Sequence, residues 1–395
     1  VQGDRPCLVD CCCAILTPNS VRLLPGGLPV RVICSRKALQ DAVQIVARAV
    51  SPRTSLPILG HLLVKTEDSR LRLLAYDLEV GIDHTVEANV QEPGALAIPA
   101  RVIGDILSTL PDTDVELSTD QSGAINLKCG TSHFSVLGLP AEEFPMLPEV
   151  AEEVKFVIDS KVLREGVGRT IFAVSTDESR VILTGVLLQV TDGNLKLVST
   201  DTHRLCVCDC PISNCEGAVN AIVPARAMQE ATRIVGDSDG EVEVVISPTQ
   251  IKFTSGETML VSRLIEGQFP NFERVIPTEF SIKLIIPAEQ FEQAMRRVEI
   301  VARESAHRTI FTLENGTLIL TAESPNVGRV REEVEVIKEG EDIKMAFNAR
   351  YILDVLGVVE TEAIEMELSG QVSPAVVRPQ GETGYIYVLM PMHLD

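Results

Sequence analysis

A chain of 395 residues is too long for one ordinary hydrophobic core, so its length predicts two or three domains. Its net charge of −21 argues against a protein that holds nucleic acid by bulk positive charge, because such domains are usually basic. Ten scattered cysteines do not make the disulfide framework of a small secreted domain, and no apolar stretch of about 18 residues is present to span a membrane, so we expect reduced thiols, a cytoplasmic location and no membrane contact.

Residues 1–30 precede the first predicted strand and fit none of the patterns that follow. They contain the run Cys11–Cys12–Cys13 and a linker-like stretch, Pro25–Gly26–Gly27. The apolar run Val9–Leu16 is interrupted by Asp10, which is unlike the core of a signal peptide. We therefore expect a disordered N-terminal extension, with a targeting segment or a metal site as the alternatives.

From Arg31 onward, one succession of elements occurs three times. The tetrapeptides Ile98–Pro99–Ala100–Arg101, Val223–Pro224–Ala225–Arg226 and Phe347–Asn348–Ala349–Arg350 lie 125 and 124 residues apart, and each precedes a run with the apolar spacing of a helix. At the same period, a strand followed by an amphipathic helix occurs at 32–50, 156–174 and 284–301. An alternating strand that ends in a turn occurs at 71–77, 195–201 and 318–324. Landmarks at one period indicate a repeated unit.

Each unit is predicted to be α+β, with an antiparallel sheet and two helices on one of its faces. The unit boundaries predicted from the repeat are 31–150, 151–279 and 280–395. The six helical stretches hold thirteen basic and eight acidic residues, although the whole chain is strongly acidic. These basic residues can simply decorate solvated helix faces. Alternatively, six equivalent helices can line the inside of a curved array and face a phosphate backbone without reading base sequence.

Four motifs in this order, inside a threefold repeat, resemble one family. They are Leu56–Pro57–Ile58–Leu59–Gly60, Ser199–Thr200–Asp201–Thr202–His203–Arg204–Leu205, Gln268–Phe269–Pro270 and Met390–Pro391–Met392–His393–Leu394. From about residue 31 to 394 the chain resembles the bacterial sliding clamp, the beta subunit of DNA polymerase III. The resemblance implies a head-to-tail homodimer whose six clamp-type units form a ring around double-stranded DNA, with helices inside and sheets outside. It also implies a processivity factor for DNA replication with no catalytic activity, cofactor or metal ion of its own.

The resemblance further implies protein partners that dock in a hydrophobic pocket between units 2 and 3. They are the DNA polymerase III alpha subunit, an ATP-driven clamp-loader complex and other proteins that carry a clamp-binding motif. Matched residue by residue, the pocket wall consists of Leu183, Thr200, Thr202, His203, Arg204, Leu205, Pro270, Arg274, Val275, Pro374, Val388, Met390, Pro391 and Met392.

The chemistry of this pocket suits an extended peptide. Methionine side chains adapt to different partners, and Met390 and Met392 supply two of them. Arg204 and Arg274 are expected to hold a polar or acidic group at the rim. The chain departs from the family at Thr202, where glycine is frequent, and at its end, His393–Leu394–Asp395, where the family often has Arg–Leu.

Two further sets of residues come from the repeat and the resemblance. The arginines expected to face DNA are Arg53, Arg101, Arg180, Arg226, Arg233 and Arg350. The dimer interface is expected to join the first unit of one chain to the third unit of the other, with Phe134 and Val136 against Ile300 and Val301. The alternative for these four apolar residues is that they belong to the ordinary core of their own units.

One rival hypothesis is an enzyme or metalloprotein. Asp201 and His203 precede four cysteines, Cys206, Cys208, Cys210 and Cys215, and a hydrolase or zinc site could use this cluster. Cysteines at i, i+2 and i+4 share one face of a strand, which is poor geometry for ligands that must converge on one ion. The sequence also lacks a glycine-rich phosphate loop that ends in Gly–Lys–Ser or Gly–Lys–Thr. A third hypothesis is a scaffold that uses the docking pocket and never closes a ring.

Overall fold

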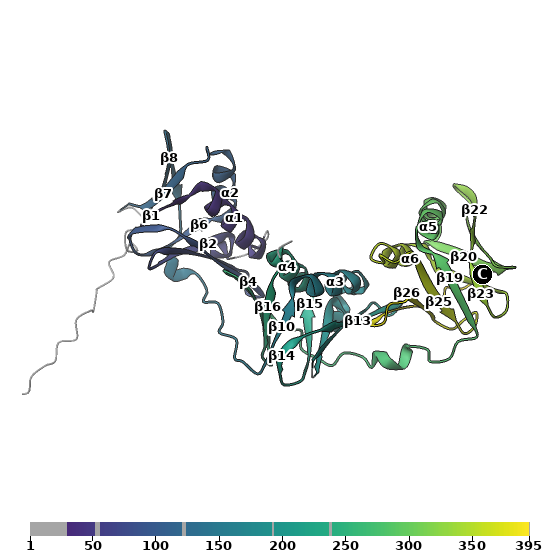
Figure 1. Cartoon of the computed structure of the whole chain (residues 1–395). Coiled ribbons are helices and arrows are strands. Elements are labelled where there is room, and N and C mark those ends of the chain that lie inside the picture. The colour runs from purple at the N-terminus through teal and green to yellow at the C-terminus, as the bar shows by residue number, and fades with distance from the viewer. Residues whose placement is uncertain (1–29, 52–55, 121–123, 192, 237–238, 395) are drawn as a thin grey trace, which may run out of the picture.

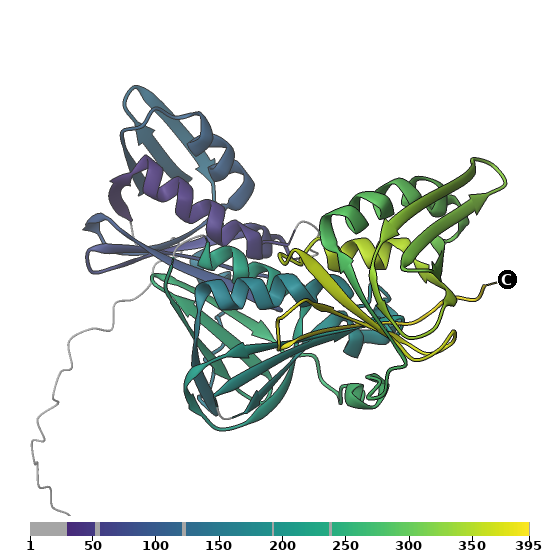
Figure 2. The same cartoon turned by 45° about the vertical axis from the view of Figure 1, so that its right-hand side comes forward.

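The structure, a computed structural model, describes residues 30–51, 56–120, 124–191, 193–236 and 239–394. The chain forms a crescent of three consecutive α+β units, with the helices along its concave side and the sheets toward its convex side (Figure 1 and Figure 2). The expected N-terminal extension, Arg53 and Asp395 lie outside the described residues. Within the described ranges, no helix is long and apolar enough to cross a membrane.

The first repeat begins with β1 and ends with β9. Its elements are β1 (Arg31–Ser35), α1 (Arg36–Val46), η1 (Ala47–Ala49), η2 (Pro57–Gly60), β2 (His61–Glu67), β3 (Arg70–Tyr76), β4 (Val80–Glu87), β5 (Asn89–Glu92), β6 (Ala95–Pro99), α2 (Ala100–Thr109), β7 (Asp114–Thr119), β8 (Ala124–Cys129) and β9 (Ser132–Leu137), where η marks a 3-10 helix. A linker over residues 138–153 follows and contains η3 (Ala141–Glu143).

The second repeat has the same elements in the same order. They are β10 (Val154–Asp159), α3 (Ser160–Thr170), η4 (Ile171–Ala173), η5 (Glu178–Thr184), β11 (Gly185–Thr191), β12 (Asn194–Thr200), β13 (Arg204–Pro211), β14 (Ser213–Glu216), β15 (Val219–Pro224), α4 (Ala225–Val235), β16 (Glu241–Ile246), β17 (Gln250–Ser255) and β18 (Thr258–Arg263). A second linker, residues 264–281, contains η6 (Phe272–Val275).

The third repeat follows the same plan. Its elements are β19 (Ile282–Pro287), α5 (Ala288–Ala302), η7 (Arg303–Ser305), β20 (Arg308–Glu314), β21 (Thr317–Ser324), β22 (Gly328–Glu335), β23 (Ile337–Glu339), β24 (Ile343–Asn348), α6 (Ala349–Leu356), β25 (Ala363–Leu368), β26 (Ala375–Pro379) and β27 (Tyr385–Leu389). The helices predicted after the three tetrapeptides are confirmed, because α2, α4 and α6 each begin at the alanine of their tetrapeptide.

The helices form because their apolar residues fall on one face. In α1, Leu39, Ala42, Val43 and Val46 are buried at the spacing i, i+3, i+4 and i+7, so one stripe faces the sheet. Some helices also have a side-chain cap, as in α3, where the Asp159 carboxylate accepts hydrogen bonds from the first free backbone N–H groups. One cluster of buried apolar residues runs through all three repeats beneath these helices.

In the described part of the chain, two of the four sheets contain nine strands, and each of these two is shared by two consecutive repeats. The order β14-β10-β16-β17-β18-β4-β3-β2-β6 joins the first and second repeats through the antiparallel pair β18 and β4. The order β15-β11-β12-β13-β27-β26-β25-β19-β23 joins the second and third through β13 and β27. We call these contacts the first and the second junction.

The other two sheets lie at the ends of the crescent. The first repeat has a five-stranded sheet, β5-β1-β7-β8-β9, and the third has a four-stranded sheet, β22-β21-β20-β24. Among the described residues, β9 and β22 are therefore edge strands with one unpaired side. An unpaired strand edge is a ready template for pairing with another chain.

Candidate functional site

The apolar floor of the candidate site forms at the second junction. Leu205 of β13 lies opposite Thr200 of β12 on one side and opposite Val388 of β27 on the other. Leu205 and Val388 are buried together with Phe272, which comes from the linker after the second repeat. Strands of two repeats and a linker therefore bring together residues that are far apart in the sequence.

A tight turn forms one wall of the site. The Asp201 carboxylate accepts hydrogen bonds from the backbone N–H groups of His203 and Arg204, at 2.9 and 3.1 Å. Thr202 has a φ of 80°, in the left-handed region that favours glycine, which explains why a glycine suits this place. The backbone N–H of Met390 donates to the carbonyl of His203 at 2.9 Å. The turn and the end of β27 thus form one continuous wall.

Arg204 lies beneath the rim that the sequence led us to expect for it. Its side chain is only 9% exposed, and its Nε donates to Asp201 at 3.0 Å. Its other guanidinium nitrogens donate to the Asp354 carboxylate and to the Phe172 carbonyl. The guanidinium also lies 4.3 Å from the ring centroid of Tyr351. Arg204 therefore joins η4, α6 and the turn, and it holds the turn in place beneath the surface of the site.

The charge of Arg204 is fixed by these neighbours. Burial by itself disfavours the guanidinium cation, but Tyr387 and the carboxylates of Asp354 and Asp201 raise the pKa of Arg204 above its ordinary value. Sequence reasoning missed Phe172, Tyr351 and Asp354 as parts of the site. No local pattern marks them, because only the packing of η4 and α6 against the turn makes them neighbours of Arg204.

Exposed apolar side chains surround this floor. Val275 of the second linker is 50% exposed and Met390 at the end of β27 is 41% exposed, and Val181 of η5 is 55% exposed. Arg180 fastens η5 to the turn, because it donates to Thr202 Oγ1 at 3.2 Å. Large exposed apolar side chains near one apolar floor are typical of a binding surface.

The remaining predicted pocket residues lie at the edges of the floor. Leu183 is buried just before β11, and Pro374 directly precedes Ala375, which pairs with the last residue of β27. Pro270 and Arg274 lie exposed on the second linker. The backbone N–H of Met392 donates to the Ala346 carbonyl at 2.7 Å, so β24 of the third repeat holds Met392. Pro391 lies between the two methionines.

The arginines expected to face DNA occupy different environments. Arg101 and Arg350 are exposed in the first turns of α2 and α6, and both helices belong to the concave side of the crescent (Figure 1). Arg226 instead pairs with Asp77 across the first junction, and Arg233 pairs with Glu230 on its own helix. Arg180 lies beside the turn at the second junction.

The four predicted interface residues lie at the two ends of the crescent. Phe134 and Val136 belong to the edge strand β9, and Phe134 is 36% exposed. Ile300 of α5 is 54% exposed, whereas Val301 is 8% exposed and belongs to the core of its own repeat. The alternative of ordinary core residues therefore describes Val301 better than Ile300.

The cysteines of β13 do not form a metal centre. Cys206, Cys208 and Cys210 are buried free thiols that share one face of the strand, toward the core under α3. Burial raises the pKa of Cys206 above its ordinary value, which keeps the thiol protonated. Over the described part of the chain, no group of three or more His, Cys, Asp and Glu residues could hold a metal ion.

Family models match all three repeats. The N-terminal domain of the DNA polymerase III beta subunit matches residues 30–148, its central domain matches 157–271, and its C-terminal domain matches 273–393. The chain belongs to the DNA polymerase III beta subunit family. Its function is that of a sliding clamp in DNA replication, in which a clamp acts as a processivity factor.

Individual members of this family agree with the match. A beta sliding clamp of Staphylococcus aureus is 31% identical over 355 residues, which are 87% of this chain and 94% of that protein. The sliding clamp of Bacillus subtilis superposes with a TM-score of 0.90 at 27% identity, over 93% of this chain and 100% of the other. A Pseudomonas aeruginosa sliding clamp bound to griselimycin gives 0.89 at 34% identity, with 93% and 100% covered.

Proposed function

We propose that two copies of this chain join head to tail and close a six-unit ring around double-stranded DNA. The observation that carries the proposal is the pair of incomplete sheets at the ends of the crescent. At each internal junction, a five-stranded part from one repeat and a four-stranded part from its neighbour make one nine-stranded sheet. The five-stranded sheet of one chain and the four-stranded sheet of another would complete a sheet of the same size.

The second junction also predicts the register of this pairing. There, Tyr387 of β27 lies opposite Cys206 of β13. By the hairpin registers of the three repeats, Phe134 of β9 is equivalent to Tyr387, and Val330 of β22 is equivalent to Cys206. We therefore expect Phe134 to lie opposite Val330 of the partner subunit.

The same equivalence supports a contact between Ile300 and Phe134 of the partner subunit. Counted from the first residue of each helix, Ile300 of α5 is equivalent to Phe172, which follows α3 in η4. The ring of Phe172 lies 6.0 Å from that of Tyr387, centroid to centroid, at the second junction. Val136 lies on the same face of β9 as Phe134, two residues further along.

The ring would hold DNA by topology. Helices line the concave side of the crescent (Figure 1), and Arg101 and Arg350 are exposed residues of two of these helices, α2 and α6. Arg226 and Arg233 add charge that is already partly balanced by Asp77 and Glu230. Weak, sequence-independent attraction to phosphates suits a protein that slides, because contacts to the backbone carry no sequence information directly.

The second junction is the proposed docking site for partner peptides. Its buried floor of Leu205 and Val388 and its exposed Met390 and Val275 fit an extended segment with large apolar side chains. The proposed partners are the DNA polymerase III alpha subunit, the clamp loader and other proteins with a clamp-binding motif.

The clamp itself is proposed to be non-catalytic and cytoplasmic. The carboxylate of Asp201, two residues before His203, is already engaged by Arg204 and by two backbone N–H groups, so it is poorly placed to assist a general base. The buried free thiols of β13 fit a reducing compartment. We keep the unit boundaries at 31–150, 151–279 and 280–395 as part of the same proposal.

A pair of cysteines tests the closing contact and its register. Phe134→Cys combined with Val330→Cys should give a covalent dimer under mild oxidation, seen on a non-reducing gel, because directly opposed residues in paired strands are close enough for a disulfide. Phe134→Cys combined with Arg331→Cys is the matched control, since neighbouring strand positions face opposite sides. A monomer in both variants, or equal cross-linking in both, would contradict the proposed seam.

A further inference from the structure

Exposed apolar side chains lie at the ends of the two edge strands. Leu137, the last residue of β9, is 83% exposed, and Val327, in the turn directly before β22, is 53% exposed. Neither residue is among those that the sequence led us to expect at the dimer interface. A single exposed apolar residue is common on a protein surface, so these two gain meaning only if they meet when two chains join.

Both internal junctions show the same backbone contact just beyond their strand ladder. At the first junction, the N–H of Arg263 donates to the carbonyl of Glu79 at 3.0 Å. At the second junction, the N–H of Met390 donates to the carbonyl of His203 at 2.9 Å. The chain that leaves one sheet edge is thus fastened to the turn of the other edge at both junctions.

Each of these hydrogen bonds lies three residues beyond a directly opposed pair in the ladder. The opposed pairs are Leu260 with Ile82 at the first junction and Tyr387 with Cys206 at the second. In the ring proposed above, the equivalent pair is Phe134 with Val330 of the partner subunit. Three residues beyond that pair, the N–H of Leu137 would reach the carbonyl of Val327 of the partner subunit.

We propose that Leu137 and Val327 of the partner subunit form an apolar contact that fixes the strand register of the closed ring. This contact depends on the ring proposed above and adds the residues that align its two chains. The residues at the same place of the first junction, Arg263 and Glu79, carry opposite charges and are also chemically matched. At the seam both side chains are apolar, and their contact removes exposed apolar surface from water.

The three junctions differ in the row that forms the floor of the docking site. This row is Thr200, Leu205 and Val388 at the second junction, and Tyr76, Gly81 and Val261 at the first. Leu147 of the first linker fills the space above Gly81, since a Cβ on Gly81 would lie 2.2 Å from Leu147 Cδ1. The equivalent row at the seam consists of Glu323 and Arg329, which form an ion pair at 2.8 Å, and Ser135 of the other chain.

A row of polar side chains does not select one alignment of two strands. A slip by two residues keeps every side chain on its own face, so this row would tolerate it. Such a slip would place Leu137 opposite Arg329 or Pro325 of the partner subunit. Within the described strands, Phe134 with Val330 is the one opposed pair of the expected register that is apolar on both sides. Leu137 with Val327 therefore gives the alignment a second anchor.

Both residues are held in place within a single chain. Directly after Leu137, the backbone packs closely, because a Cβ on Gly138 would lie 2.7 Å from the carbonyl oxygen of Ala97. The turn that carries Val327 is closed by a hydrogen bond from its N–H to the carbonyl of Ser324 at 3.3 Å. The contact can therefore form with little loss of backbone freedom.

A charge swap tests the contact while the strand pairing stays in place. Leu137→Lys should raise the dissociation constant of the dimer at least about tenfold, and Val327→Glu should do the same, because each puts a charge where an apolar side chain becomes buried. Sedimentation velocity of the labelled full chain measures this constant. With both changes in one chain, opposite charges meet at the seam. The dimer should then be at least about fivefold tighter than the product of the two single effects.

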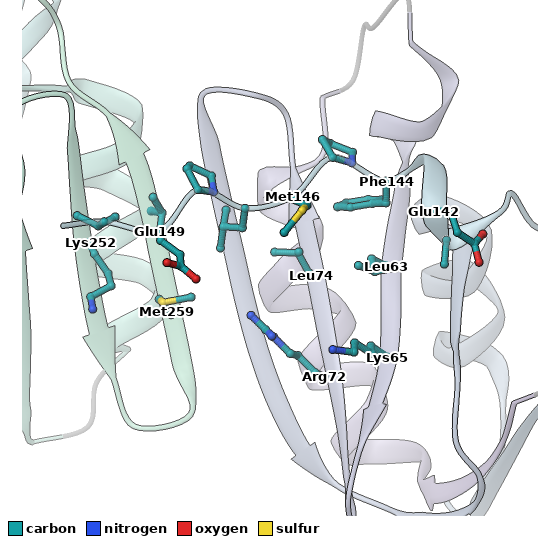
Figure 3. A pocket seen from close by; sticks show the side chains of 16 residues that line it. Leu63, Lys65, Arg72, Leu74, Glu142, Phe144, Met146, Glu149, Lys252 and Met259 are labelled. Atoms are coloured by element: carbon teal, nitrogen blue, oxygen red, sulfur yellow. The ribbon is translucent and has the colours of Figure 1, made fainter. Parts of the chain in front are cut away.

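Two matched controls accompany this cycle. Leu137→Lys with Val327→Lys places like charges against each other and should show no such recovery. Met146→Lys adds the same charge at an exposed apolar residue away from the seam, and it should leave the dissociation constant unchanged. Met146 is 90% exposed, and Figure 3 shows it on the first linker, over Leu74.

The outcomes separate the contact from the ring itself. Single variants that dimerise like the wild-type chain would overturn the contact, and so would single effects that simply multiply in the charge swap. If Phe134→Cys with Val330→Cys still cross-links in that case, the ring stands without this contact. If the wild-type chain forms no dimer and the cysteine pair does not cross-link, the ring proposal fails and the contact fails with it.

Discussion

At the first junction Arg226 pairs with Asp77, while at the second Arg204 joins two carboxylates and two aromatic rings. The backbone ladders of the two junctions are equivalent, with β18 on β4 in one and β27 on β13 in the other. Strand pairing thus builds the curved frame at every junction. The side chains that lie over these strands decide whether a junction has an open pocket or one that the chain's own linker fills.

Removal of Arg204 should break the second junction most severely. Arg204→Ala leaves Asp201 and Asp354 without their shared cation, and we expect the free energy of unfolding to fall by about 3 kcal/mol. Arg204→Lys should recover little, because a lysine lacks the planar fork and the stacking surface. Urea denaturation measures the free energy of unfolding of both variants. Arg274→Ala is the control, because Arg274 is exposed on the linker, and its free energy of unfolding should stay within about 0.5 kcal/mol of the wild-type value. Equal effects of Arg204→Ala and Arg274→Ala would refute the central role of Arg204.

Gly81→Leu tests the comparison directly, because it gives the first junction the residue that the second has at Leu205. The new side chain would collide with Leu147, and overpacking should cost about 2 kcal/mol. Leu147→Ala in the same chain should recover most of this loss, since it vacates the space. Thermal unfolding by calorimetry is the measurement. If Gly81→Leu alone were as stable as the wild-type chain, Leu147 of the linker would not fill the space above Gly81.

Arg226→Ala should loosen the first junction by a smaller amount. Asp77 is 6% exposed, but it keeps hydrogen bonds from the backbone N–H groups of Glu79 and Val80, so we expect a loss of about 1.5 kcal/mol. Arg101→Ala is the matched control, because Arg101 holds the same position in the first repeat and its side chain is 94% exposed. Similar urea midpoints for the two variants would show that Arg226 does not stabilise the first junction.

The smallest expected effect is a pH dependence confined to the first junction. Burial lowers the pKa of His84, against the opposing pull of Asp83, Glu257 and Asp41, and His84 Nδ1 lies 2.8 Å from Thr258 Oγ1 of β18. Because the pKa of His84 is lower in the folded state than in the unfolded state, neutral His84 contributes to stability in full above the ordinary histidine pKa of about 6.5. This contribution is lost as the pH falls through the pKa of the folded state.

Amide hydrogen exchange of β4 and β18 can follow this effect. Below about pH 6.5 we expect both strands to lose protection relative to β13 and β27, where the equivalent position is the buried Cys208, which has no imidazole that could become a cation. His84→Gln should remove the difference. Parallel loss of protection at both junctions in the wild-type chain would show that His84 is not its source.

The repeated pattern explains how much of this fold could be predicted. The tetrapeptides that contain Ala100, Ala225 and Ala349 predict three helices, because each follows a strand and precedes a run with a 3.6-residue apolar period. Such signals are local. The sharing of one sheet by two repeats is not local, because β18 and β4 are paired by register over a long separation and no periodicity marks it.

The site was predictable in part for the same reason. Thr200, Leu205 and Val388 were expected together, and strand register places them in one row. Arg204 and Arg226 were assigned by motif and by position, yet each arginine is engaged by acids of another element. Which acid pairs with a charged side chain depends on how the helices pack together. The distance between two side chains on different elements cannot be derived from a single sequence.

Retention on circular DNA tests the central claim most directly. The fluorescently labelled clamp is loaded onto a nicked circular plasmid with the clamp loader and ATP, and gel filtration then measures how much protein stays with the DNA. A topological ring predicts that the clamp stays on the circle and leaves within minutes once a single cut makes the plasmid linear, because phosphate contacts alone are weak at physiological salt. Equal retention on circular and linear DNA would contradict the ring.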